Sequence, residues 1–430
     1  MPQQEDHLDV FANRSELHIG TECVVFKEGG QDVATQARYR KICETFASGF
    51  LEKVLADTIT GTNDYALLPT AIREKITMMV DEITSEQGRA LVGLFYLQLA
   101  IKAIAPEQSI RLHKGGNTSK GFSWKQGISM RSLDKVYTCP FLRDHELLNL
   151  NKDGAMMTRS LAENYPYSTL YKAAIRGPVS QWIELIDAIE ENQFDSKLAL
   201  SFMTSLLQNR SEKFKKEADK AIALVAGLES IGLDSAIEFL ARFFNSTTYA
   251  ARALEVVMHA LMQALSELDG LDGKKVCPLS QMRSANLKAG NIGDIELQES
   301  GITVEVWDAK YGKTYFWDEL EELRQKLLSR DGVTVAGFVS NSNPDMRNDI
   351  IDRKQEIEVE TNSKIHILSF SEWVHFQCGN LTKEQRGKIG QKWIQAVVES
   401  FGRRRLAIAP IDEPCDKWLA DLVSLLSGPL

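Results

Sequence analysis

The second half of the chain switches between two hydrophobic periods, and this pattern predicts alternating strands and helices. Apolar and polar residues alternate with period two over 302–310, as in a strand, whereas apolar residues recur three and four positions apart over 316–328, as in an amphipathic helix. Continuous apolar runs predict further strands at 333–339 and 364–370, with a polar-faced helix at 346–359 between them. Together with a strand that carries Asp294, the predicted order is strand, strand, helix, strand, helix, strand.

Most of the chain before residue 271 follows helical spacing, apart from residues 1–30, which show little pattern. A Gly/Asp/Lys cluster at 270–275 is a turn signal and the best predicted domain boundary. We therefore predict a mixed α/β protein, with a mostly helical N-terminal region followed by an α/β core that has a mixed central sheet. The predicted parts are a helical region at 1–110, a basic segment at 111–177, a helical bundle at 178–271 and the core with C-terminal helices at 276–430.

Strand parity places an acid and a lysine on one face of the 302–310 strand. Side chains of a strand alternate between its two faces. One face is predicted to carry Ile302, Val304, Val306, Asp308 and Lys310. The other is predicted to carry Thr303, Glu305 and Trp307. We expect the three apolar residues to anchor the first face in a core, and Glu305 to join the acid and lysine only through a β-bulge.

Carboxylates on two neighbouring strands are suited to hold a divalent cation. Mg²⁺ prefers oxygen ligands, binds through one or two carboxylates and keeps several waters. The predicted ligands are Asp294 and Asp308, with Glu296 and Glu305 in reserve. A bound metal activates a water and stabilises charge at a phosphate, and we expect Lys310 to position or deprotonate that water. Asp294, Asp308 and Lys310 are thus the predicted catalytic residues.

An acid on one strand, with an acid-x-lysine at the end of the next, resembles the PD-(D/E)xK nucleases. The resemblance covers roughly residues 286–376 and is more specifically to type II restriction endonucleases of the SacI-like group. It implies a cytoplasmic homodimer that cuts double-stranded DNA at a symmetric site with Mg²⁺, while a cognate methyltransferase protects host DNA. Because a glutamate is expected before the lysine in the SacI-like group, the second metal ligand stays open between Asp308 and Glu305.

Composition restricts the class of protein further. A length of 430 residues predicts two or three domains, and the net charge of −9 argues weakly against nucleic-acid binding over the whole surface. The six cysteines are scattered without a C-x-x-C pair, so we expect free thiols and no structural zinc. The chain has no apolar run of about 18 residues, so we expect no membrane span. Its first residues are polar and acidic and lack a secretory pattern. It also has no phosphate-binding G-x-x-x-x-G-K-[ST] motif.

Positive charge is concentrated between residues 111 and 176, where 11 Lys and Arg face five Asp and Glu. Aromatic, Asn and Gln residues are interspersed with these charges. Lysine and arginine neutralise DNA phosphates, while Arg, Asn and Gln read base edges. The alternative is a solvated basic face over buried tyrosines. The residues predicted to contact DNA are Lys125, Gln126, Arg131, Asn151, Lys152 and Arg159, with Lys288 from the segment before Asp294.

The functional hypothesis is a Mg²⁺-dependent type II restriction endonuclease. One alternative is a repair or recombination nuclease on the same core, which recognises DNA structure rather than sequence. A second alternative is a non-catalytic DNA-binding protein built mainly on the helical segments. A restriction endonuclease is expected to cut a plasmid into discrete fragments, and a structure-specific nuclease is expected to give a smear. A non-catalytic protein is expected to show no metal-dependent cleavage.

Overall fold

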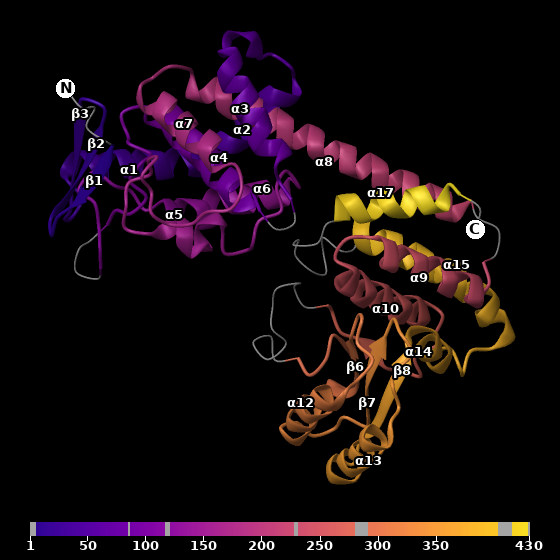
Figure 1. Ribbon diagram of the computed structural model, residues 1–430. Coiled ribbons are helices and arrows are strands. Elements are labelled where there is room, and N and C mark those ends of the chain that lie inside the picture. The colour runs from indigo at the N-terminus through magenta and orange to yellow at the C-terminus, as the bar shows by residue number, and fades with distance from the viewer. Residues whose placement is uncertain are drawn as a thin grey trace. The chain divides into compact units, whose positions relative to one another are not determined.

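The protein forms two compact units in a computed structural model that describes residues 6–84, 87–116, 121–227, 231–279, 291–402 and 415–428. The first unit is Met1–Lys213 and the second is Phe214–Leu430. The N-terminal half is mostly helical, and the C-terminal half contains a five-stranded mixed sheet interleaved with helices (Figure 1). The predicted mixed α/β fold class is therefore confirmed.

The division between the units lies within one helix, α8 (Ser196–Ala226), and not at the predicted turn near residue 270. The segment predicted as one bundle at 178–271 is shared between the units. Its first helix, α7 (Val179–Glu190), belongs to the first unit, whereas α9 (Leu233–Ser246) and α10 (Ala250–Glu267) belong to the second. Helical periodicity identified these helices, but it carries no information about which core each helix covers.

The first unit begins with a small antiparallel sheet that the hydrophobic pattern did not predict. Its strands are β1 (His7–Val10), β2 (Arg14–Ile19) and β3 (Glu22–Lys27), in the order β1-β2-β3. The inner face packs Leu17 and Phe26 against Leu112 and Trp124 of the following basic segment. The outer face carries charged and histidine residues, and the period-two alternation that they create spans only four to six residues in each strand.

Helices pack around a central apolar helix in the rest of the first unit. The central helix is α4 (Arg89–Ile104), which is buried along nearly its whole length because it is apolar on all sides. Besides α7 and the first part of α8, the described residues of this unit form the helices α1 (Val33–Ala47), α2 (Phe50–Ile59), η1 (Tyr65–Leu67), α3 (Thr70–Asp81), α5 (Met130–Leu133), η3 (Asp134–Thr138), α6 (Cys139–Asp144), η4 (Ala155–Met157) and η5 (Arg159–Ala162).

The sheet of the second unit has the strand order β4-β5-β6-β7-β8. Its strands are β4 (Lys275–Val276), β5 (Ile295–Glu299), β6 (Ile302–Ala309), β7 (Val335–Ser340) and β8 (Lys364–Ser369). Strands β4, β5 and β6 pair antiparallel, whereas β6, β7 and β8 run parallel. The helices α12 (Trp317–Leu328) and α13 (Asn348–Thr361) make the crossovers between the parallel strands.

Helices cover both faces of this sheet (Figure 1). On one face, Val306 packs with the apolar sides of α12 and α13. On the other, Trp307 packs with α10, α14 (Phe370–Gln377) and α15 (Lys383–Gly402), in a core that also includes α9 and α17 (Cys415–Leu426). A sheet covered on both sides explains why residues 305–308 are all buried.

The predicted alternation is correct from Glu305 to Lys310 but wrong for the first residues of β6. Because of the register shift at Val304, Thr303 pairs with Gln298 on the face that carries Val306, and Ile302 lies on the opposite face. Ile302 is 55% exposed, so it does not anchor the core as expected, whereas Val306 and Asp308 are buried. Ile302 lies beside the turn that joins β5 to β6, where the helical layer no longer covers the sheet. Among the described residues, no helix is both long and apolar enough to cross a membrane.

Candidate active site

Asp294 and Asp308 lie next to each other where β5 begins and β6 ends. The backbone amide of Asp294 donates to Oδ1 of Asp308 at 3.1 Å, and the amide of Ala309 donates to Oδ2 of Asp294 at 3.0 Å. The neighbouring register pairs Ile295 with Trp307 in antiparallel geometry. The two predicted acids are therefore brought together, although Asp294 directly precedes the strand on which we expected it.

Local backbone packing fixes this approach. Gly293 passes close to the backbone of β6, since a Cβ on it would lie 3.0 Å from the carbonyl oxygen of Trp307. A residue with a side chain would force the backbone before Asp294 away from β6. The glycine thus lets the first acid reach the end of the neighbouring strand.

Burial and mutual repulsion make the Asp308 carboxylate unfavourable in its charged form. Asp308 is 6% exposed, and burial raises its pKa. The negative charge of Asp294 raises it further, and the nearby ammonium groups of Lys310 and Lys326 offset part of the effect, leaving a pKa of about 6. A cation shared by the two carboxylates would relieve this repulsion.

Lys310 follows β6 directly and turns its ammonium group to the acids. Its Nζ lies 3.2 Å from Oδ2 of Asp308, and its amide donates to the carbonyl of Val339 on β7 at 2.8 Å. Burial opposes the charged form of Lys310, but the carboxylates of Asp308 and Asp294 outweigh burial and leave its pKa raised. In this arrangement the two carboxylates favour the charged form of the lysine.

A second lysine, which the sequence did not single out, reaches the site from α12. Lys326 Nζ lies 3.9 Å from Oδ2 of Asp308 and 2.8 Å from Glu322 one helical turn earlier. Its side chain is 11% exposed. The signal in the sequence was the Glu322–Lys326 spacing of four residues, which is also the ordinary spacing of a surface ion pair.

Glu296 shares the face of Asp308 but is turned toward the backbone before β5. It pairs directly with Val306 across the antiparallel ladder and is buried. Its Oε1 accepts from the amide of Ile292 at 2.5 Å and, more weakly, from that of Gly293 at 3.4 Å. Glu296 therefore shapes the approach of Asp294, and the structure does not turn its carboxylate toward the acid pair.

Glu305 lies on the opposite face of the sheet, away from Asp308. Its carboxylate accepts from Trp307 Nε1 at 2.7 Å and Gln377 Nε2 at 2.8 Å, and pairs with Lys274 at 2.7 Å. A bulge interrupts the β5–β6 register between the pairs made by Leu297 and Gln298, but it precedes Glu305 and leaves the parity from Glu305 to Asp308 intact. The structure thus does not bring Glu305 into the proposed ligand set.

The donor set fits a small hard cation. Two carboxylates, with the remaining positions left to water and phosphate oxygens, are the usual protein contribution to Mg²⁺ sites. Backbone amides already hold one oxygen of each aspartate, so the carboxylates are fixed before an ion arrives. The raised pKa of Asp308 reflects the unfavourable negative charge of two neighbouring carboxylates, which a bound cation would compensate.

The predicted DNA-contacting residues of the first unit are all exposed, and four of them flank one buried aspartate. Asp134 accepts from the Met156 amide at 3.0 Å and from Thr138 Oγ1 at 3.2 Å, which holds the turn at 151–154 against η3. The predicted DNA-contacting residues around this turn are Arg131, Asn151, Lys152 and Arg159, and all four are exposed. We call these four residues the Asp134 patch. A Cβ at Gly154 would lie 2.3 Å from Asp134 Oδ2, so only glycine allows the turn to sit this close.

The other predicted contacts lie elsewhere or outside the described residues. Lys125 and Gln126 are exposed on the segment that pairs with the chain after β3, where the Lys125 amide donates to the carbonyl of Lys27 at 2.9 Å. Lys288 lies outside the described residues.

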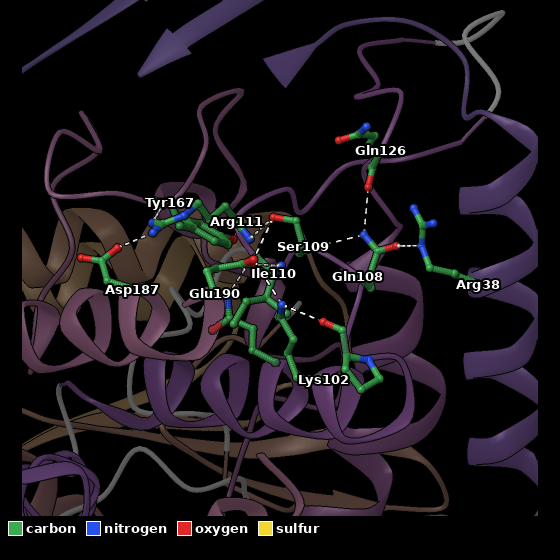
Figure 2. A network of polar contacts seen from close by, with 12 residues as sticks. Arg38, Lys102, Gln108, Ser109, Ile110, Arg111, Gln126, Tyr167, Asp187 and Glu190 are labelled. Atoms are coloured by element: carbon green, nitrogen blue, oxygen red, sulfur yellow. Dashed lines mark hydrogen bonds and ion pairs between the residues drawn. The ribbon is translucent and has the colours of Figure 1, made fainter. Parts of the chain in front are cut away.

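Arg111 of the basic segment helps to hold the first unit together instead of facing solvent. Figure 2 shows Arg111 donating to Asp187 at 2.5 Å and to the carbonyl of Tyr167 at 2.9 Å. In the same network, Glu190 of α7 accepts from the amide of Ile110 at 2.6 Å and pairs with Lys102 at 3.2 Å. The alternative reading of this segment, a solvated basic face over buried tyrosines, is correct for the buried Tyr167. It is wrong for Arg111, whose side chain is only 13% exposed.

The comparisons with known proteins add no assignment, since no family and no curated protein matches the chain.

Proposed function

We propose that this protein is a Mg²⁺-dependent endonuclease that hydrolyses phosphodiester bonds in double-stranded DNA. The observation that carries the proposal is the convergence of Asp294, Asp308 and Lys310 at the adjoining ends of β5 and β6. Two carboxylates and an amine on an α/β sheet form the arrangement that the resemblance to the PD-(D/E)xK nucleases implies. The resemblance further implies the type II restriction class, with a homodimer, a cognate methyltransferase and a cytoplasmic location.

The chain's own residues divide the work between ion binding and charge compensation. Asp294 and Asp308 would hold Mg²⁺, which when bound activates a water and stabilises charge on the phosphate oxygens. Lys310 keeps its proton beside the two carboxylates and supplies a positive charge to the scissile phosphate. Lys326 adds a second positive charge near Asp308. The raised pKa of Lys310 favours this electrostatic role over proton abstraction.

DNA contact is assigned to the Asp134 patch, together with Lys125, Gln126 and Lys288. Arginine and lysine in the patch would neutralise phosphates, and Asn151 and Gln126 carry the amide groups suited to adenine edges. The side chain of Arg159 is 96% exposed even though it lies 3.6 Å from Glu163, so it is accessible to a ligand.

Plasmid digestion with the purified full chain tests the proposal. We expect Mg²⁺-dependent cleavage into discrete fragments whose ends share one sequence. A smear would indicate a nuclease that recognises DNA structure and not sequence, and the proposed metal site would stand. Intact plasmid under all Mg²⁺ conditions, with the protein folded, would overturn the nuclease proposal in favour of the non-catalytic DNA-binding alternative.

A further inference from the structure

The outer face of the N-terminal sheet gathers five side chains of metal-binding types on three adjacent strands. His7 pairs with His18 across β1 and β2, and His18 pairs with Cys23 across β2 and β3. Asp9 pairs with Glu16 in the same register. Because directly paired residues and residues two apart on a strand share a face, all five point to the same side. The opposite side is the one that buries Leu17 and Phe26.

His18 is the centre of this group. Its Nε2 lies 3.7 Å from Cys23 Sγ, 3.8 Å from Asp9 Oδ2 and 3.9 Å from Glu16 Oε2. Among the described residues, two triads have ligand atoms that all lie within 4.8 Å of one another, and both contain His18. These triads are His7–Asp9–His18 and Glu16–His18–Cys23.

The distances match neighbouring ligands of one ion better than they match direct hydrogen bonds. The nitrogen–oxygen separations around His18 exceed hydrogen-bond length. Ligands of a tetrahedral zinc ion lie about 3.3–3.6 Å apart, given the usual zinc–nitrogen, zinc–oxygen and zinc–sulfur bond lengths. The separations of Cys23 Sγ and Glu16 Oε2 from His18 Nε2 need only a few tenths of an ångström of closure. The rings of His7 and His18 are stacked 4.4 Å apart and nearly parallel, so His7 packs against the ring of the central histidine.

We propose that this face binds Zn²⁺ through the triad Glu16, His18 and Cys23, with water in the fourth position. The donor set of an imidazole, a carboxylate and a thiolate suits zinc and disfavours Mg²⁺. Arg14 donates to Oε1 of Glu16 at 2.5 Å, which leaves Oε2 turned to His18. The ion would cross-link β2 and β3 and stabilise a sheet whose inner core is small. This site is separate from the acid pair of the proposed active site and does not depend on the proposed nuclease activity.

The sequence alone gave a different expectation, namely no structural zinc. The sequence has no C-x-x-C pair, and the five-residue spacing of His18 and Cys23 is not one of the usual zinc-ligand spacings. The hairpin between β2 and β3 supplies the missing proximity, since it folds Cys23 directly opposite His18. Alternating His and acid at positions 7, 9, 16 and 18 was the available signal.

Titration of the chelator-treated full chain with Co²⁺ and Zn²⁺ tests the site. We expect one Co²⁺ to bind with a thiolate-to-cobalt charge-transfer band that added Zn²⁺ removes. His18→Ala is expected to weaken Zn²⁺ binding at least roughly 100-fold, because even outer-shell partners contribute 10–100-fold to metal affinity. Cys23→Ser is expected to lose the charge-transfer band.

Two control variants separate this site from others. His145→Ala removes an exposed histidine of the same unit and is expected to leave Zn²⁺ affinity unchanged. Asp308→Ala changes the proposed active site and is expected to keep the thiolate–cobalt band. The proposal is overturned if the wild type shows no such band, or if the band and Zn²⁺ affinity persist in His18→Ala. A circular dichroism spectrum like that of the wild type establishes that each variant is folded.

Discussion

Asp294 and Asp308 are linked across β5 and β6 by two hydrogen bonds from backbone amides, although their carboxylates repel each other. The amide of Asp294 donates to Asp308 at 3.1 Å, and Asp294 accepts from the amide after Asp308 at 3.0 Å. The hydrogen bonds fix both carboxylates, and burial leaves their charge poorly solvated. A pair held together against its own repulsion costs stability, and such costs are typical of functional sites.

Replacing Asp308 by asparagine is expected to stabilise the metal-free protein at neutral pH. The folded-state pKa of Asp308 is about 6, above the value of about 4 in an unfolded chain. The folded state therefore binds the additional proton, and wild-type stability falls as pH rises from about 4 to about 6. Asp308→Asn lacks this loss, so its advantage at pH 7 is on the order of 2 kcal/mol and vanishes below about pH 4.

Urea unfolding at several pH values, with a chelator present, measures this difference. Asp331→Asn removes an exposed acid after α12 and serves as the matched control, for which we expect the wild-type pH profile. An Asp308→Asn variant less stable than wild type at pH 7 would show that the carboxylate is stabilised in the fold, and the repulsion argument would fail.

The two lysines near Asp308 are expected to differ in their effect on cleavage. Lys310 Nζ is nearer to Asp308 Oδ2, at 3.2 Å against 3.9 Å for Lys326, which is also shared with Glu322. Lys310→Ala is expected to lower the single-turnover rate at least about 100-fold, the usual loss when one preorganised charge is removed. Lys326→Ala is expected to lower it by about tenfold, or roughly 1.4 kcal/mol in the barrier.

The control for Lys326 is Lys354, which pairs with Glu358 in the same four-residue spacing on α13, at 3.1 Å. Lys354→Ala is expected to keep the wild-type rate. Equal rates for Lys326→Ala and Lys354→Ala would remove Lys326 from the site, while wild-type activity of Lys310→Ala would remove the charge role given to Lys310.

Glu305 is expected to support the fold and not the reaction. Its buried carboxylate joins Lys274, Trp307 and Gln377, and glutamine offers no charge to the lysine. Glu305→Gln is expected to lower the free energy of unfolding by about 1–3 kcal/mol. Cleavage per folded molecule is expected to stay within about twofold of wild type, well below the tenfold that corresponds to 1.4 kcal/mol. A loss of activity without a loss of stability would indicate that Glu305, and not Asp308, is the second metal ligand.

The Asp134 patch is expected to contribute to DNA affinity through phosphates. Each of Arg131→Ala, Lys152→Ala and Arg159→Ala is expected to weaken DNA binding in chelator and to reduce the slope of log affinity against log salt by about 0.9. Lys197→Ala, an exposed charge at the start of α8, is the control and is expected to leave the slope unchanged. An unchanged slope in all three patch variants would move DNA contact away from this turn.

The sequence predicted the site correctly where a short periodic pattern determines which face of a strand a side chain occupies. Strand parity correctly predicted that Asp308 and Lys310 share one face and that Glu305 lies on the other. The prediction holds there because the bulge in β6 precedes Glu305. Parity did not reveal that Glu305 would be satisfied by Lys274 and Gln377, which come from distant segments. Lys326 was missed for the same reason, since α12 brings it to Asp308 only after packing on the sheet.

The fold class followed from periodicity, whereas domain limits did not. Hydrophobic spacing predicted the helices α12 and α13 and the strands β7 and β8 within a few residues. Thr382 and Gln385 form a capping box just before α15, with hydrogen bonds of 2.8 and 3.3 Å between them. The division within α8 depends on which core each end of a continuous helix joins, and that choice is made by tertiary contacts.

Plasmid cleavage by acid variants measures the central claim most directly. In Mg²⁺, wild type and Asp331→Asn are expected to cut at equal rates. Asp294→Ala and Asp308→Ala are expected to lose at least about 1,000-fold in rate, because removal of a catalytic group costs this much or more, while both still bind DNA in chelator. Cleavage at the wild-type rate by folded Asp308→Ala would contradict the assignment of these two carboxylates as the metal site.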